Sequence, residues 1–194
     1  GITMEGPFFS MGKRGAQNPE HLRLPDAALF ARLQREAAGL IRIACIAPEL
    51  PGALDCIRTV AAEGVKVSLA HTEADYDTAS AAFDAGAAHV THLFNAMPPL
   101  LHRAPGVIGA ASERETVTAE LIADGIHVHP SAVRAAFRLF PGRVCLVSDA
   151  LSACGMPEGE YMLGGQAIRV SGPRAMLSDG TLAGSVATLF DCMK

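Results

Sequence analysis

Short apolar runs alternate with helical stretches along the chain. Uninterrupted apolar runs of this length are typical of parallel strands that are buried on both faces. The pattern therefore predicts a βα series with six strands. The apolar runs cover residues 1–4, 41–47, 65–70, 87–91, 116–123 and 143–148.

The stretches between these runs carry helix signals. Asp26 can cap a helix that runs to about Gly39, and further helices are expected near 50–63, 75–85 and 131–140. The pattern changes at residues 161–178, which read as a β-hairpin insertion that pairs with a small β-sandwich domain. We expect a last helix to open at the TLAGS segment, residues 181–185.

Polar residues lie at the ends of five of the six predicted strands: Glu5, His71, His92, His127 and Asp149. Reactive groups of parallel α/β folds gather at the carboxyl ends of the strands. An open doubly wound sheet is possible, but a barrel directs many strand ends at one centre, so we favour an incomplete (β/α)8 TIM-type metallohydrolase barrel. Residues 1–194 are expected to be a catalytic barrel fragment that lacks N-terminal strands, β-sandwich segments and the C-terminal end.

The composition restricts partners and compartment. Of the 194 residues, 49% are hydrophobic and 19% are charged, a balance that a buried parallel sheet explains. No apolar run approaches the roughly 18 residues of a membrane helix. The net charge of −4, without basic clusters, argues against nucleic acid as a main partner. Five cysteines without a C-x-x-C pair fit free thiols in a reducing, cytoplasmic compartment.

Glu5, His71 and His92 are candidate metal ligands. A hydrolytic metal site uses a few neutral imidazoles and a carboxylate, with one coordination position left for water. The spacings are long, so only the fold can bring the three residues together. Taken singly, a histidine at a strand end is also explained as a hydrogen-bonded structural residue. The recurrence of such residues on successive strands favours the metal site.

Asp149 ends a strongly apolar strand, where a carboxylate without a partner is costly to bury. We interpret it as the general base that takes a proton from the attacking water and returns it to the leaving group. The alternative is an N-cap for the next segment. His127 is expected to bind substrate or metal, and its apparent H-x-H pattern with His129 is weak evidence alone.

Two loops are candidate anion sites. Asn95 and Ala96 offer backbone N–H groups directly after a predicted strand, and Arg103 adds a positive charge in the same loop. The planar guanidinium suits phosphate because it donates two aligned hydrogen bonds, although a solvated surface arginine is the commoner case. Gly184 can bring backbone close to a ligand at the start of a helix.

Several motifs together resemble a known family. They are MEGPF at 4–8, KRGAQNPEHLR at 13–23, AHT at 70–72, THLFNAMPPLLHRAPG at 91–106, ADGIHVHP at 123–130, LVSDA at 146–150 and GTLAGS at 180–185. In this order they are similar to the N-acetylglucosamine-6-phosphate deacetylases of the amidohydrolase superfamily. The THLFNAM motif and the EGPF, KRGA and NPEH block are the specific ones.

The resemblance implies removal of the acetyl group from N-acetylglucosamine 6-phosphate, a (β/α)8 barrel beside a small β-sandwich, and a homodimer. By position, it implies metal ligation by Glu5, His71 and His92 and acid/base catalysis by Asp149. It also implies that Arg103 reaches the active site of the neighbouring subunit. The substrate contacts implied by the resemblance are Ala16, Gln17, Asn95, Ala96, Arg103, His127, Leu182, Ala183 and Gly184.

Some features stay open at the level of sequence. Some family members carry histidine where this chain has Gln17, and glutamine keeps a donor but loses the titratable group. The expected cofactor is a divalent ion, with zinc first and iron or manganese as alternatives, at one or two per subunit. The alternative functions are hydrolysis of another acetylated amino-sugar phosphate and a non-catalytic metal- or sugar-phosphate-binding relative.

Overall fold

The computed structural model describes residues 1–194 and contains the six predicted parallel strands. All neighbouring strands in this sheet pair in parallel. Their order in the sheet is the order in the sequence. The strands are β1 (Ile2–Phe8), β2 (Ile41–Ile46), β3 (Lys66–Leu69), β4 (Ala87–Val90), β5 (Thr118–Ile122) and β6 (Val144–Val147).

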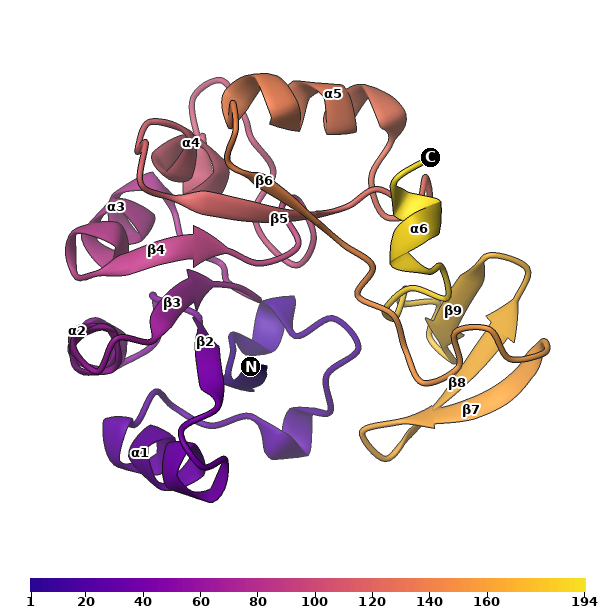
Figure 1. The fold of residues 1–194 in the computed structure, drawn as a ribbon, viewed down its shortest axis with the longest axis horizontal. Coiled ribbons are helices and arrows are strands. Elements are labelled where there is room, and N and C mark those ends of the chain that lie inside the picture. Colours follow the sequence, from indigo (N-terminus) through magenta and orange to yellow (C-terminus); the bar gives the residue numbers. More distant parts are fainter.

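This order decides between the two predicted architectures. A doubly wound sheet reverses its strand order at a switch point, whereas β1 to β6 follow one another without reversal. Figure 1 shows β2 to β6 along an arc with the helices on its outer side, and β1 pairs with β2 at one end of the sheet. The fold is therefore an α/β half-barrel of six parallel strands, consistent with an incomplete TIM-type barrel. Pairing with a β-sandwich stays a prediction.

Helices cover the outer face of the arc. Asp26 caps α1 by accepting hydrogen bonds from Ala28 N and Leu29 N, as its position in the sequence predicts. The main core lies between helices and sheet and includes the fully buried Phe30, Ile57 and Phe140. The helices are α1 (Ala27–Glu36), α2 (Ala53–Ala62), α3 (Tyr76–Asp84), α4 (Gly106–Ser112) and α5 (Pro130–Leu139).

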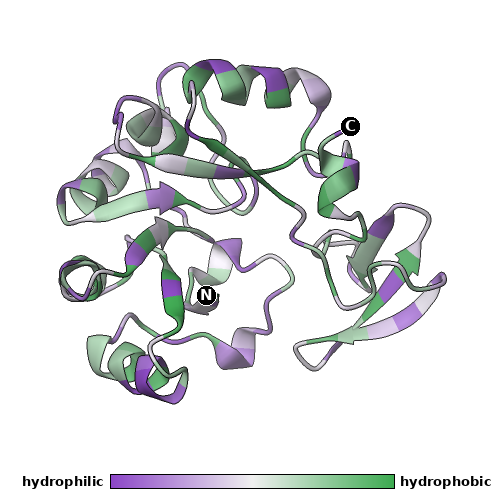
Figure 2. Cartoon of the chain, viewed as in Figure 1, coloured by the Kyte–Doolittle hydropathy of each residue, from purple (hydrophilic) through white to green (hydrophobic).

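The mixed colouring of α5 in Figure 2 reflects an amphipathic surface helix, which buries Ala136 and leaves Phe137 exposed. The short helix α4 was not predicted, because its small residues, GVIGAAS, lack a polar and apolar alternation. No helix of the structure has the length and apolar character that crossing a membrane requires. All five cysteines are free.

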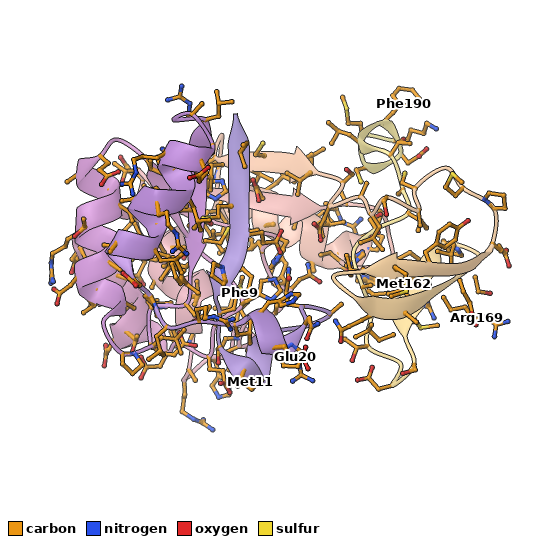
Figure 3. The ribbon with its side chains drawn as sticks, turned by 90° about the horizontal axis from the view of Figure 1, so that it is seen from below. Phe9, Met11, Glu20, Met162, Arg169 and Phe190 are labelled. Carbon is orange, nitrogen blue, oxygen red and sulfur yellow. The ribbon has the colours of Figure 1, made fainter.

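The chain after β6 forms a second, smaller sheet. It consists of three antiparallel strands, where the sequence predicted a two-stranded hairpin. They are β7 (Gly159–Leu163), β8 (Gln166–Ser171) and β9 (Arg174–Leu177). Figure 3 shows this sheet, marked by Met162 and Arg169, beside the parallel sheet. A small core of its own includes Ile168, Val170 and Ala183.

The expected helix start at 181–185 is wrong. The segment pairs with other backbone instead: Ser185 N donates to Asp149 O at 2.8 Å, and Ala183 N donates to Ala175 O at 2.9 Å. The last helix, α6 (Leu189–Cys192), begins only after Thr188, whose side chain caps it. The segment thus links the small sheet to the end of β6.

Candidate active site

A cavity of about 440 Å³ opens at the carboxyl ends of the parallel strands. Twelve of the thirteen residues predicted for the site line it: Glu5, Ala16, Gln17, His71, His92, Asn95, Ala96, His127, Asp149, Leu182, Ala183 and Gly184. Arg103 does not line it and is exposed in the loop 91–105 between β4 and α4. The fold therefore brings together residues that lie up to 179 positions apart, as the difference between 184 and 5 shows.

The backbone turns sharply at three of these residues. His71, His92 and Asp149 each lie two positions after the last residue of a strand, and their φ angles are 46°, 34° and 49°. Left-handed conformations of non-glycine residues cost free energy and cluster at functional sites. The same backbone conformation recurs at equivalent positions after β3, β4 and β6. It therefore marks the carboxyl end of the half-barrel as the functional end.

Three side chains converge to form a candidate metal centre. Glu5 Oε1 lies 3.0 Å from His71 Nε2 and 3.5 Å from His92 Nε2, and the two Nε2 atoms are 3.1 Å apart. Tetrahedral ligands at 2.0–2.1 Å from a zinc ion lie about 3.3 Å from one another. The spacing of the three ligand atoms therefore fits a divalent ion.

The tautomer of His71 also fits a metal ligand. Its Nδ1 lies 2.8 Å from Lys13 O, a carbonyl that can only accept, so Nδ1 carries a proton and Nε2 is the ring nitrogen left to ligate a metal ion. The ring stacks on Phe9 with centroids 4.3 Å apart, which fixes its orientation. These contacts direct the Nε2 atom of His71 towards Glu5 and His92.

Electrostatics differ sharply between the two carboxylates of the site. Burial raises the pKa of Glu5, but its hydrogen bonds with His71 and His92 outweigh burial and bring the pKa well below its ordinary value. Burial raises the pKa of Asp149, and the negative charge of Glu5 raises it further. Two carboxyl groups with pKa values pushed apart are typical of a division between charge stabilisation and proton transfer.

The loop after β4 offers fewer backbone donors than the sequence suggests. Asn95 N already donates to His92 O at 2.9 Å within a turn. The Ala96 N–H has no hydrogen-bond partner in the protein and lies at the cavity, with a φ of 51°. Ala96 is therefore the free backbone donor of this pair.

Sequence reasoning missed six residues at or beside the cavity: Gly15, Ile122, Leu151, Leu163, Thr181 and Asp124. Leu163 lines the cavity from the small sheet, and Thr181 lines it from the segment after that sheet. The βα pattern of the sequence does not predict where the small sheet lies relative to the cavity. Asp124 pairs with His127, with 2.7 Å between Asp124 Oδ2 and His127 Nδ1. An aspartate followed by glycine is a turn signal, and it could have identified this residue. His129 is the N-cap of α5 and not a site residue.

Gly184 is required by a close approach of backbone. A Cβ atom at this position would lie 2.7 Å from Asp149 O and 3.0 Å from Leu151 Cδ2. We expect Gly184→Ala to cost about 1–3 kcal/mol of stability and to lower kcat by displacing the backbone of Asp149. Urea denaturation and steady-state kinetics of the variant test both effects. Unchanged values for both would show that the neighbouring backbone moves without consequence.

A buried polar network lies beneath the site. Ser68 Oγ hydrogen bonds with Thr91 Oγ1 at 2.6 Å and with His89 Nδ1 at 2.9 Å, and Cys45 Sγ contacts Thr91 at 3.3 Å. Burial, followed by the charge of Lys66, lowers the pKa of His89 to about 4. The network explains His89 as a neutral structural residue.

The low pKa of His89 predicts a pH dependence of stability. Between its folded value of about 4 and its ordinary value of 6.5, the unfolded chain binds a proton that the folded chain does not. Stability is therefore lost as the pH falls through this window, by up to about 3 kcal/mol. Urea denaturation from pH 4 to 7 measures the loss, which should be smaller in His89→Gln. An equal slope in both proteins would contradict the assignment.

Comparisons with known proteins identify sequences that are similar to this chain. No family model matches it. The N-acetylglucosamine-6-phosphate deacetylase of Bacillus subtilis (strain 168) is 48% identical over 188 residues, which are 96% of this chain and 47% of that protein. The N-acetylgalactosamine-6-phosphate deacetylase of Escherichia coli O157:H7 is 38% identical over 189 residues, 97% of this chain and 50% of that protein. The chain thus spans about half the length of the curated relatives it matches.

Solved structures agree with these relatives. One is an aspartate-to-alanine mutant of the N-acetyl-D-glucosamine-6-phosphate deacetylase from Mycobacterium smegmatis in complex with N-acetyl-D-glucosamine-6-phosphate. The two structures superpose with a TM-score of 0.96 at 41% sequence identity. The aligned region covers 99% of this chain and 51% of the Mycobacterium smegmatis chain. In sequence and in fold, the chain belongs to the N-acetylglucosamine-6-phosphate deacetylase family and corresponds to about half of one of its members.

Proposed function

We propose that the protein hydrolyses the amide bond of N-acetylglucosamine 6-phosphate, which gives glucosamine 6-phosphate and acetate. The observation that carries the proposal is the joint placement of Glu5, His71, His92 and Asp149 around one cavity. Relatives with this activity in their names align over almost the whole chain.

Glu5, His71 and His92 would hold a divalent ion, for which zinc is the first choice and iron or manganese are alternatives, at one or two per subunit. When bound, such an ion polarises a carbonyl oxygen and lowers the pKa of water. The carboxylate of Glu5 offsets part of the positive charge. His71 would ligate the ion through Nε2, because its Nδ1–H donates a hydrogen bond to Lys13 O.

Asp149 would move the proton during the reaction. As a base it takes a proton from the attacking water, and as an acid it returns that proton to the amine nitrogen as the amide bond breaks. An amine leaves poorly unless it is protonated, so both transfers are needed. The raised pKa of Asp149 supports the role because a carboxyl group with a raised pKa exchanges protons nearer neutral pH.

The remaining cavity residues are proposed to bind the sugar phosphate. Asn95, the free N–H of Ala96 and Arg103 would contact the phosphate group, and binding there would orient the acetyl group by remote interactions. Arg103 is exposed and away from the cavity of its own chain. This placement supports the proposal that it completes the site of a neighbouring subunit in a homodimer. Ala16, Gln17, His127, Leu182, Ala183 and Gly184 would contact the sugar and its acetyl group.

A second candidate substrate has support from one relative. The N-acetylgalactosamine-6-phosphate deacetylase at 38% identity shows that similar sequences occur with a different sugar in their name. A non-catalytic relative is a weaker candidate because Glu5, His71, His92 and Asp149 are all present and line one cavity. The five free cysteines support a reducing, cytoplasmic location.

The test is acetate release by the full-length protein after metal loading. The substrates are N-acetylglucosamine 6-phosphate, N-acetylgalactosamine 6-phosphate and unphosphorylated N-acetylglucosamine. We expect rapid release from the first and slow release from the unphosphorylated sugar, because the phosphate contacts are lost. Preference for the galactosamine derivative would favour the second candidate. Absence of release from all three, with metal bound, would contradict the proposed function.

A further inference from the structure

Asp124 is a buried carboxylate that no substrate role explains. It lies in the turn after β5, and its side chain is only 2% exposed. Oδ1 accepts hydrogen bonds from Ile126 N at 2.9 Å and from His127 N at 2.8 Å. Oδ2 lies 2.7 Å from His127 Nδ1. Burial raises the pKa of Asp124, but the hydrogen bonds from His127 and Ile126 bring it below its ordinary value. The carboxylate is therefore ionised.

The ring of His127 faces an acceptor on each side. Its Nδ1 meets the ionised Asp124, and its Nε2 lies 3.1 Å from Ala183 O. A carbonyl oxygen only accepts hydrogen bonds, so the second contact requires a proton on Nε2. The first contact requires a proton on Nδ1. Only the ring with protons on both nitrogens satisfies both partners.

We propose that Asp124 is a positioning residue that holds His127 as a doubly protonated donor, with its Nε2–H at the wall of the cavity. The inference rests on the proposed function. A cationic donor suits a substrate oxygen that carries negative charge or exposed lone pairs, and charge-assisted hydrogen bonds are the stronger ones. Asp124 would thus strengthen substrate binding without touching the substrate.

The same contacts connect three segments at the edge of the cavity: the turn after β5, the segment 181–185 and the end of β6. His127 follows β5, and Ala183 belongs to the segment whose Ser185 N donates to Asp149 O at 2.8 Å. The hydrogen bond from His127 to Ala183 O therefore links the turn at Asp124 to the backbone beside the proposed acid/base. A substrate oxygen at Nε2 would share or replace the Ala183 carbonyl as acceptor.

The first test is the protonation pattern of His127 in the full-length protein. Histidine ring nitrogens are labelled with ¹⁵N, their long-range proton couplings are recorded near neutral pH, and the His127 signals are assigned by their loss in His127→Gln. We expect both nitrogens to be protonated. An unprotonated nitrogen in His127 would overturn the proposal. This spectrum requires no Asp124 variant, so the test stands even where such a variant fails to fold.

The second test uses Asp124→Asn. The amide oxygen stays with the two backbone N–H groups, so the amide NH₂ faces Nδ1, which must then accept. We expect His127 to lose its Nδ1 proton and keep its Nε2 proton. Asp179→Asn is the matched control, because Asp179 also accepts a backbone N–H, from Thr181 at 2.9 Å, but is exposed. An unchanged His127 spectrum in folded Asp124→Asn would overturn the proposal.

Kinetics distinguish positioning from a merely structural role. In Asp124→Asn we expect KM for N-acetylglucosamine 6-phosphate to rise roughly tenfold or more, and kcat to change less. A double variant with His127→Gln should be no worse than His127→Gln alone, because Asp124 acts through that ring. Additive losses would overturn the proposal. Failure of the wild-type protein to release acetate would instead reject the proposed function, and the spectra would still decide the role of Asp124.

Discussion

Asp149→Asn is expected to lower kcat for acetate release by about 10²–10⁴-fold, the range that a positioned proton-transfer group contributes. Asparagine has nearly the same shape and keeps one oxygen, so the cavity should stay intact. It cannot accept a proton from water at neutral pH or return one to the departing amine. Both steps of the proposed reaction therefore lose their acid/base group, whereas substrate binding at the phosphate end is untouched.

The measurement is steady-state kinetics of the metal-loaded full-length protein, with thermal melting and metal content as checks on folding. KM should change little, because Asp149 acts on the reacting atoms rather than on the phosphate. Asp179→Asn removes an exposed carboxylate and should leave kcat unchanged. A folded, metal-loaded Asp149→Asn variant with full activity would show that another group moves the proton.

The strands could be predicted because their pattern is local. The inner strands β3, β4 and β5 are largely buried, so their apolar runs stand out in the sequence. The runs also identified His71, His92 and Asp149, whereas Glu5 lies inside β1 and not at its end. Asp26 likewise identifies the start of α1, because a helix N-cap is a local hydrogen-bonding event. These local signals identified the strand-end residues of the cavity, whereas Ala16, Gln17 and Leu182 were predicted from the family resemblance.

The features that could not be predicted depend on contacts between distant segments. Residues 181–185 contain no strand signal, yet their backbone pairs with Asp149 and Ala175, which replaces the expected helix start. Arg103 is a different case. Its predicted role is in the active site of a second subunit, so the structure of one chain does not test that role.

Asp124 shows how a local signal can carry more than its usual meaning. The sequence Asp-Gly predicts a turn, and the turn is present, with Asp124 accepting the N–H groups of Ile126 and His127. Its second oxygen meets the ring of His127 only because the chain folds back at that point. The turn residue and the cavity residue are therefore one unit.

Glu5→Gln is the second variant with a large expected effect, here on metal affinity. Replacement of groups that merely support metal ligands typically costs about 10–100-fold in affinity, and loss of the single carboxylate ligand should exceed that. The amide keeps the size of the side chain but removes the negative charge that faces both imidazoles, at 3.0 Å from His71 and 3.5 Å from His92. Activity should fall in parallel with metal occupancy.

Metal content after dialysis and the rise in melting temperature on metal addition measure this effect without reference to turnover, because an ion that binds only the folded state stabilises it. Glu120→Gln is the matched control. Glu120 is a carboxyl group beside the same site, and its pKa is raised, first of all by burial, but it is outside the three-residue ligand group. Loss of metal from Glu5→Gln alone would identify Glu5 as a ligand. Equal loss from both variants would mean that the general negative charge of the half-barrel, rather than direct ligation, holds the ion.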